Sequence, residues 1–295
     1  MDGKKQNEII IVNSFKGGAG KTTLALTHCI NDLFHEHKYE NVIYIDLDIL
    51  GTATSCLFDK DKLPLEKSFD HTGRAVEVHL AYDGENRSFH VVYLSPRLKT
   101  QTMYGGLNYI NHQELAQQRL RDDILTYVGN IVEKRKGNLI VFDCAPGFSR
   151  MEQELLMACY GMKLGKKADV REEYVVTLDS AHIEKCIGCI RDSWEILPIR
   201  PEFRKVRLTM NDIQNYYRYV SEDTKADVEQ QFCEMAQEVS TRLQREDGVQ
   251  NTDIYLWRYS KEIAMRAIFK HQWFVENQVD NYIMTSDSYK MYEPI

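Results

Sequence analysis

Residues 16–23 read Lys16-Gly17-Gly18-Ala19-Gly20-Lys21-Thr22-Thr23. An apolar run over residues 8–13 precedes this loop, and a helical pattern over residues 22–35 follows it. Strand, glycine loop and helix in this order form the setting in which a glycine-rich segment binds nucleotide phosphates. Glycines let the backbone turn tightly and direct N–H groups inward, while the helix N-terminus adds partial positive charge. We therefore predict a phosphate site formed by Gly17, Gly18, Ala19, Gly20, Lys21, Thr22 and Thr23.

Acidic residues follow two further apolar runs. Asp46 and Asp48 come at the end of the run over 41–45, and Asp143 follows the run over 139–142. The carboxyl ends of parallel strands are where such sheets bind ligands. The sequence therefore predicts that these aspartates lie beside the phosphate loop, with capping of a neighbouring helix as the alternative.

The chemistry of phosphoryl transfer assigns roles to these side chains. The reaction needs neutralised charge and an aligned water more than it needs covalent help. We expect Lys21 to reach the β- and γ-phosphates and the Thr22 hydroxyl to bind Mg²⁺. Asp143 would hold the metal through water, and Asp46 would support the metal shell. The predicted metal ligands are thus Thr22, Asp46 and Asp143.

Short apolar runs alternate with helical patterns along the chain. Predicted strands cover 8–13, 41–45, 76–80, 89–94, 139–142, 174–178, 206–210 and 253–257, and predicted helices cover 22–35, 112–134, 152–162, 181–194, 224–245 and 261–274. This alternation predicts an α/β fold, a doubly wound and mainly parallel sheet with helices on both faces. We expect one domain over 1–295, with a possible hairpin insertion within 59–100 and a C-terminal tail at 276–295.

Three local expectations accompany this layout. Residues 59–74 are polar and predict an irregular segment, and residues 163–173 predict a charged connection. In the strand over 206–210, apolar and polar residues alternate, which predicts a half-exposed strand.

The bulk composition narrows the class of protein. The 295 residues are 43% hydrophobic and 27% charged, which is ordinary for a soluble globular chain. A net charge of −7 argues against a chain coated with basic charge for nucleic acid, while leaving room for a local patch. Seven cysteines show no disulfide framework, no signal peptide pattern opens the chain, and no apolar run approaches about 18 residues. These features predict a reduced, cytoplasmic protein.

The loop departs from the general phosphate-loop motif at Phe15, where that motif has glycine, and adds a second lysine at Lys16. Segment 14–23 resembles the deviant loop of the ParA/MinD family of ATPases, and Phe15 makes it most similar to ParA-like members. Ile45-Asp46-Leu47-Asp48 resembles the family's Asp-x-Asp segment, and residues 139–147 resemble its Walker B strand and the switch after it. The three matches occur in family order within the first half of the chain.

The resemblance implies a P-loop NTPase of the SIMIBI type, with ATP and Mg²⁺ as cofactors and slow hydrolysis stimulated by a partner protein. It also implies that Asp48 orients the attacking water and that Lys16 crosses a homodimer interface to the partner's nucleotide. A cation supplied in trans stabilises developing charge and makes nucleotide state and dimer state one equilibrium. The catalytic candidates are Lys16, Lys21 and Asp48, and the alternative for Lys16 is a solvated surface lysine.

Two features carry open alternatives. No Thr-Lys-x-Asp guanine-reading motif is present, which favours adenine. Residues 206–211 resemble the late strand where the family places an asparagine on the adenine, so Asn211 is the candidate, with an ordinary turn asparagine as the alternative. Cys186 and Cys189 have metal or redox spacing, although packing on a helix is the favoured interpretation.

Three classes of function follow from these patterns. A DNA-associated partitioning ATPase, found in the cytoplasm and on the nucleoid, would contact non-specific DNA through two basic clusters, and solvated loop faces are the alternative. The clusters are Arg200, Arg204, Lys205 and Arg207, and Lys163, Lys166, Lys167 and Arg171. A membrane-associated positioning ATPase is disfavoured because the helix over 261–274 is not terminal. A scaffold or electron-transfer protein with a shared metal cluster is the third class. The favoured function is an ATP-driven dimer switch in DNA partitioning or cargo positioning.

Overall fold

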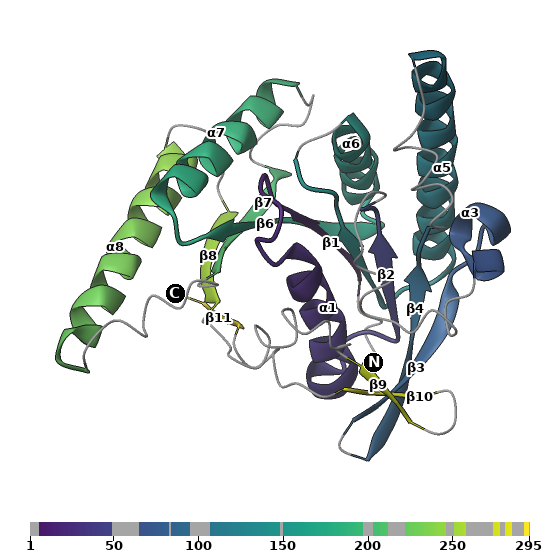
Figure 1. Cartoon of the computed structure of the whole chain (residues 1–295), viewed down its shortest axis with the longest axis horizontal. Helices are drawn as coiled ribbons and strands as arrows, with labels where there is room; N and C mark the ends of the chain where they lie inside the picture. Colours follow the sequence, from purple (N-terminus) through teal and green to yellow (C-terminus); the bar gives the residue numbers. More distant parts are fainter. Residues whose placement is uncertain are drawn as a thin grey trace.

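The structure is a computed structural model of the chain. It describes residues 6–48, 65–82, 84–94, 107–147, 150–196, 203–211, 222–245, 251–257, 274–277, 281–284 and 292–294. Within these ranges the strands form one sheet in the order β11-β8-β7-β6-β1-β5-β2-β4-β3-β10-β9 (Figure 1). The strands from β8 to β4 in this order run parallel, which confirms the predicted mainly parallel sheet.

The parallel strands form the centre of the sheet. Their bounds are β1 (Asn7–Asn13), β2 (Asn41–Asp46), β4 (Glu85–Val92), β5 (Asn138–Asp143), β6 (Ala168–Thr177), β7 (Lys205–Asn211) and β8 (Asn251–Trp257). β1 lies between β5 and β6 and is the strand that leads into the glycine loop. The predicted phosphate loop therefore sits at the middle of the sheet, at its carboxyl edge.

The edges of the sheet are antiparallel or mixed. β3 (Val76–Tyr82) pairs antiparallel with β4, and Gly84 in the turn has a φ of 79°, which confirms the predicted hairpin. β10 (Asn281–Met284) pairs with β3, β9 (Phe274–Asn277) pairs with β10, and β11 (Tyr292–Pro294) pairs with β8. Phe274 thus begins a strand, so the predicted helix is wrong at its last residue, and its other residues lie outside the described ranges.

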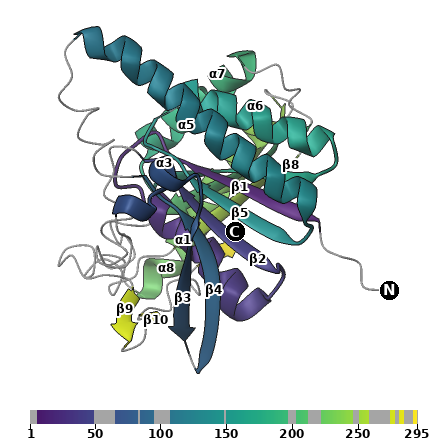
Figure 2. The same ribbon diagram turned by 90° about the vertical axis from the view of Figure 1, so that its right-hand side faces the viewer.

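Helices cover both faces of the sheet (Figures 1 and 2). One face carries α1 (Lys21–Asn31), which continues into the π-helical turn η1 (Asp32–Glu36). The other face carries α5 (Leu107–Lys134), α6 (Arg150–Leu164), α7 (Ser180–Ile196) and α8 (Glu222–Arg245). A 3-10 turn (Leu65–Lys67) and α3 (Phe69–Thr72) replace part of the predicted irregular segment. Among the described residues, no helix combines the length and the apolar character needed to cross a membrane.

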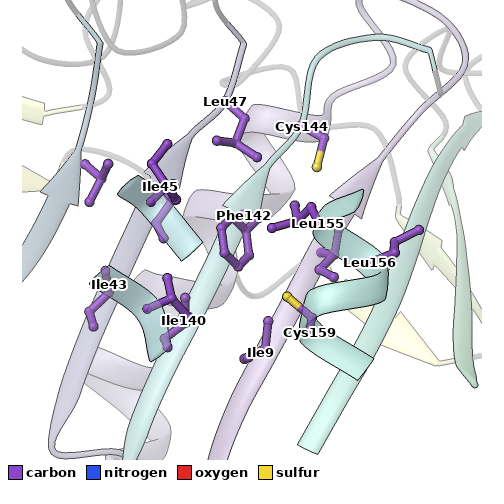
Figure 3. Packing of buried hydrophobic residues seen from close by; sticks show 14 of the residues in the cluster. Ile9, Ile43, Ile45, Leu47, Ile140, Phe142, Cys144, Leu155, Leu156 and Cys159 are labelled. Atoms are coloured by element: carbon purple, nitrogen blue, oxygen red, sulfur yellow. The ribbon is translucent and has the colours of Figure 1, made fainter. Parts of the chain in front are cut away.

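The apolar runs seen in the sequence are strands that are buried on both sides. Successive side chains of a strand point to opposite faces. Ile10 and Val12 therefore join the cluster under α1, while Ile9 and Ile11 join the cluster under α5 and α6. Figure 3 shows this second cluster, in which Phe142 lies among aliphatic side chains of β1, β2 and α6. Continuous apolar runs are typical of parallel strands covered on both faces.

β6 is longer than predicted because its charged residues are paired inside the protein. It begins at Ala168, within the segment 163–173 that was expected to be a connection. Glu172 and Glu173 are fully buried, and Glu173 Oε2 lies 2.7 Å from His28 Nε2 on α1. Burial tends to raise the pKa of Glu173, but His28 and nearby arginines outweigh it and hold that pKa below its usual range. The predicted connection is wrong from Ala168 onward, because buried partners make this charged run compatible with a central strand.

β7 is also more buried than the alternating pattern predicts. Every residue of the strand after Lys205 is buried. Its polar residues face the α1 side, where Thr209 donates to Glu173 at 2.7 Å and the Arg207 guanidinium stacks over the Tyr255 ring at 4.0 Å. The prediction of a half-exposed strand is therefore wrong, since polar partners rather than water meet this face.

The basic clusters considered as DNA contacts are mostly used within the protein. Arg204 is 0% exposed, and Arg200 lies outside the described residues. Hydrogen bonds or ion pairs with neighbouring groups hold Lys163, Lys167, Arg171, Lys205 and Arg207. Most of the described charges in these clusters therefore have a partner within the chain, while Lys166 is exposed.

Arg204 instead completes a buried polar network. Its Nε and Nη2 donate to the two carboxylate oxygens of Glu172 at 2.7 and 2.5 Å. The hydroxyls of Tyr160 and Tyr174 donate to the same carboxylate at 2.6 and 2.7 Å. Burial works to raise the pKa of Glu172, but the Arg204 charge and these hydrogen bonds keep that pKa below its usual range. The network ties α6 and β6 to the segment that leads into β7.

Replacing Arg204 by alanine should lower the free energy of unfolding by about 3–5 kcal/mol, because the Glu172 carboxylate would stay buried without its partner. Lys205→Ala removes a half-exposed ion pair with Asp169 and should cost less than about 1 kcal/mol. Urea denaturation followed by circular dichroism measures both variants. Equal losses would contradict a structural role for the buried arginine.

Candidate nucleotide site

The loop between β1 and α1 has the backbone conformation that its glycines permit. Gly18 and Gly20 have φ values of 75° and 101°, in the left-handed region that side chains disfavour. α1 begins immediately afterwards at Lys21, and the Leu24 N–H donates to the Gly20 carbonyl at 2.9 Å. Gly17 has no positive φ, and a Cβ there would meet no atom within 4 Å. Neither strain nor packing within the protein explains this glycine, whereas a ligand that approaches the backbone would.

Three contacts hold the loop in place from other parts of the chain. The Phe15 ring stacks on Tyr174 of β6, with centroids 5.9 Å apart and an interplanar angle of 7°. The Asn211 side chain, at the end of β7, donates to the Ala19 carbonyl at 2.8 Å. The Gly147 N–H, beyond β5, donates to the Ser14 carbonyl at 2.8 Å. Phe15, which departs from the general motif, therefore attaches the loop to β6. Contacts from the ends of β5 and β7 hold the loop as well.

Two aspartates lie side by side under the loop. Asp46 ends β2, Asp143 ends β5, and the strand register places them opposite one another. They are 2% and 0% exposed. Burial and then the neighbouring Asp46 carboxylate raise the pKa of Asp143 to about 7, although Lys21 and two hydroxyl groups act in the opposite direction. A second positive charge near this pair would therefore favour the ionised form of Asp143.

The Asp143 carboxylate suits a hydrated cation. Its Oδ2 accepts a hydrogen bond from the Tyr44 hydroxyl at 2.8 Å. Its Oδ1 is buried and makes no hydrogen bond of normal geometry within the described residues. No cluster of three or more His, Cys, Asp or Glu side chains forms a metal cage in the described part of the chain. Mg²⁺ bound with a nucleotide uses only one or two carboxylates together with phosphate oxygens and water, so Asp143 and Thr22 fit that role.

The structure brings most predicted site residues to the same edge. Lys21 is 7% exposed, and its charge acts on Asp143 across the base of the loop. Asp48 is half-buried, and its backbone N–H donates to Asp46 Oδ1 at 3.0 Å. Lys16 is exposed, and it makes no ion pair within the described residues. The roles predicted for these side chains remain predictions, but their placement at one edge suits them.

Asn211 has a contact that the sequence did not indicate. Its amide braces the phosphate loop through Ala19, across 192 residues of sequence. The adenine contact predicted for this side chain stays a prediction. An asparagine at the end of a strand gives no signal of such a long-range partner, because the bond depends on the order of strands in the sheet.

Tyr44 and His182 are two further side chains at this edge that sequence reasoning missed. Tyr44 lies within an otherwise aliphatic strand. A hydroxyl group in such a run could have indicated a buried polar partner. The His182 Nδ1 accepts from the Thr177 backbone N–H at 3.1 Å, and burial followed by the Lys16 charge lowers the pKa of the ring. His182 thereby joins the start of α7 to the end of β6, close to the loop.

Other candidate sites do not compete with this one. Cys186 is buried and Cys189 is partly buried on α7, which agrees with packing on a helix. A cavity of about 320 Å³ lies under the C-terminal half of α1, lined by residues that include Glu8, Arg171 and Arg207. It lies near the amino ends of β1 and β6, away from the loop, and several of its charges are in ion pairs, Glu8 with Arg171 and Lys38, and Arg207 with Glu173.

No protein-family model matches the chain, and no curated protein sequence matches it. Solved structures do. A Borrelia burgdorferi B31 protein described as a plasmid partition protein, bound to AMPPNP, is 15% identical over 97% of this chain and 95% of its own, with a TM-score of 0.50. The structure of pNOB8 ParA bound to nonspecific DNA is 14% identical over 90% and 92%, with a TM-score of 0.57. These similarities establish a shared fold, and with the loop they confirm the α/β P-loop NTPase fold.

Asn211→Ala should weaken ATP binding about tenfold, because the Ala19 carbonyl would lose its buried donor and the loop would lose a brace. Asn41→Ala is the control, since that side chain donates to Asn138 Oδ1 at 3.1 Å near the amino end of the sheet. Fluorescence anisotropy with labelled ATP measures both affinities. A loss of the same size in the control would show that the effect is general instability.

Proposed function

We propose that this protein is an Mg²⁺-dependent ATPase of the ParA/MinD type that acts as an ATP-driven dimer switch in partitioning or positioning. The observation that carries the proposal is a phosphate loop beside the buried Asp143, whose Oδ1 makes no hydrogen bond of normal geometry within the described residues. The fold shared with a partition protein bound to AMPPNP supports a nucleoside triphosphate as the ligand. The deviant form of the loop supports the ParA/MinD type over an ordinary P-loop NTPase.

The chain's own groups supply the main elements of the reaction. The N-terminus of α1 and the buried Lys21 neutralise phosphate charge, and the loop N–H groups orient the phosphates. Asp48 would orient the attacking water, and Thr22 with Asp143 would hold the metal, with Asp46 in support. When bound, Mg²⁺ would supply positive charge that stabilises the charge developing on the phosphates.

Lys16 makes the proposed switch dimeric. It lies on the same loop as Lys21, yet Lys16 is exposed while Lys21 is buried. The exposure of Lys16 supports a role at the nucleotide of a second copy rather than at its own. ATP would then form part of the interface, and hydrolysis would release the two subunits.

Lys16→Ala should bind ATP within about threefold of the wild type and lose ATP-dependent dimerisation, since the cation supplied in trans would be missing. Asp48→Ala should bind ATP and stay dimeric because hydrolysis would be slow. Lys136→Ala, at an exposed position after α5, is the control. Size-exclusion chromatography with light scattering in ATP, in ADP and without nucleotide measures all of them. A Lys16→Ala protein that dimerises normally with ATP would rule out this role.

The proposed partners are a second copy of the chain, a protein that stimulates hydrolysis, and DNA as the matrix. Support for DNA comes from the fold shared with pNOB8 ParA bound to nonspecific DNA. The internally paired basic clusters argue that any DNA surface uses other residues or forms only in the dimer.

DNA binding of this kind should require ATP, ignore sequence and weaken steeply with salt, because released counterions drive it. Filter binding or anisotropy with two unrelated duplexes, between about 50 and 200 mM salt, measures this dependence. Asp48→Ala in ATP should bind most tightly, and ADP should abolish binding. No retention of DNA with ATP at the lowest salt would remove DNA as the matrix and leave the ATPase proposal standing.

A further inference from the structure

Tyr44 is a polar side chain in the middle of an apolar strand. Its neighbours in β2 are Val42, Ile43 and Ile45, and Tyr44 itself is 0% exposed. The ring packs in the cluster under α1, together with Cys29. The hydroxyl donates to Asp143 Oδ2 at 2.8 Å. A phenylalanine or leucine would fill the same space, so the contact with Asp143 is what the hydroxyl adds.

The sheet register explains how this contact arises. Asp46 lies opposite Asp143, and Tyr44 lies two residues earlier on the same face of β2. The tyrosine therefore reaches the Asp143 carboxylate from within the sheet, whereas Thr22 and Lys21 act on it from the start of α1, beyond the strand ends. Asp143 Oδ2 thus accepts the hydrogen bond from Tyr44. Asp143 Oδ1 makes no hydrogen bond of normal geometry in the described residues.

We infer that Tyr44 is a positioning residue that fixes the orientation of Asp143, so that Oδ1 is presented to the hydrated Mg²⁺. The inference rests on the proposed function, because it concerns the metal of that same site. The terminal torsion of an aspartate is broad and close to two-fold, so a carboxylate without a fixed partner samples several orientations. A hydrogen bond to Oδ2 removes that freedom before the metal arrives.

Hydrogen bonds that orient a metal ligand have measurable effects on affinity. Removing such an outer partner commonly lowers metal affinity about 10–100-fold. The contact of Tyr44 is with the carboxylate and not with the phosphates. The inference therefore separates two quantities: the Mg²⁺ dependence of ATP binding, which Tyr44 sets, and metal-free ATP binding, which it leaves unchanged.

Tyr44→Phe tests the inference because it removes only the hydroxyl and keeps the ring in the core. Tyr160→Phe is the matched control, since Tyr160 is also buried and also donates to a buried carboxylate, Glu172, at 2.6 Å. Fluorescence of a labelled ATP is recorded in EDTA and then during a Mg²⁺ titration. Thermal unfolding in EDTA reports the stability of each variant.

We expect Tyr44→Phe to need about 10–100-fold more Mg²⁺ for half-saturation, with unchanged ATP affinity in EDTA. Tyr160→Phe should keep the wild-type Mg²⁺ dependence even if it unfolds at a lower temperature. A wild-type Mg²⁺ dependence in Tyr44→Phe, or an equal shift in Tyr160→Phe, would overturn the inference and leave the proposed function intact. A wild-type protein that binds no ATP, with or without Mg²⁺, would overturn the proposed function itself.

Discussion

The burial of Asp46 and Asp143 on neighbouring strands is the constraint around which the candidate site is built. Burial disfavours the charged form of Asp143, and repulsion from the neighbouring Asp46 carboxylate adds to this effect, so the pKa of Asp143 rises to about 7. Such a pair is stable in its charged form only beside positive charge. Lys21 supplies part of it, and a metal ion would supply the rest. Phosphate is itself an anion, so this edge of the sheet favours the nucleotide and the cation together over either alone.

The loop above these aspartates is held rigid by contacts that its own motif does not contain. Phe15 stacks on Tyr174. Asn211 donates a hydrogen bond to the Ala19 carbonyl in the loop, and the Gly147 N–H donates one to the Ser14 carbonyl just before the loop. Donors that are fixed before the ligand arrives need little reorganisation on binding. The glycines supply the required backbone angles, and neighbouring strands supply the stiffness. A site of this kind depends on β5, β6 and β7 as much as on the loop itself.

The phosphate loop, the apolar strands and the β3–β4 hairpin could be predicted because each is encoded by neighbouring residues. The start of β6 and the burial of β7 could not, since Glu172, Glu173 and Arg207 look solvated until their buried partners are known. The contact of Asn211 with Ala19 and that of Tyr44 with Asp143 could not be predicted from the sequence either. Both join residues about 100–190 positions apart, so they follow from strand order and not from local pattern.

The central place of β1 has a consequence for synthesis of the chain. β1 precedes in the chain both of the strands that flank it in the sheet, since β5 and β6 end only at Asp143 and Thr177. Both of these later strands must be synthesised before the two edges of this very apolar strand are paired. Contacts so distant in sequence form slowly and leave strand edges open meanwhile. A nascent chain that already contains the complete glycine motif therefore still exposes β1 as an unpaired hydrophobic segment, and its phosphate site is not braced until β5 and β6 have joined the sheet.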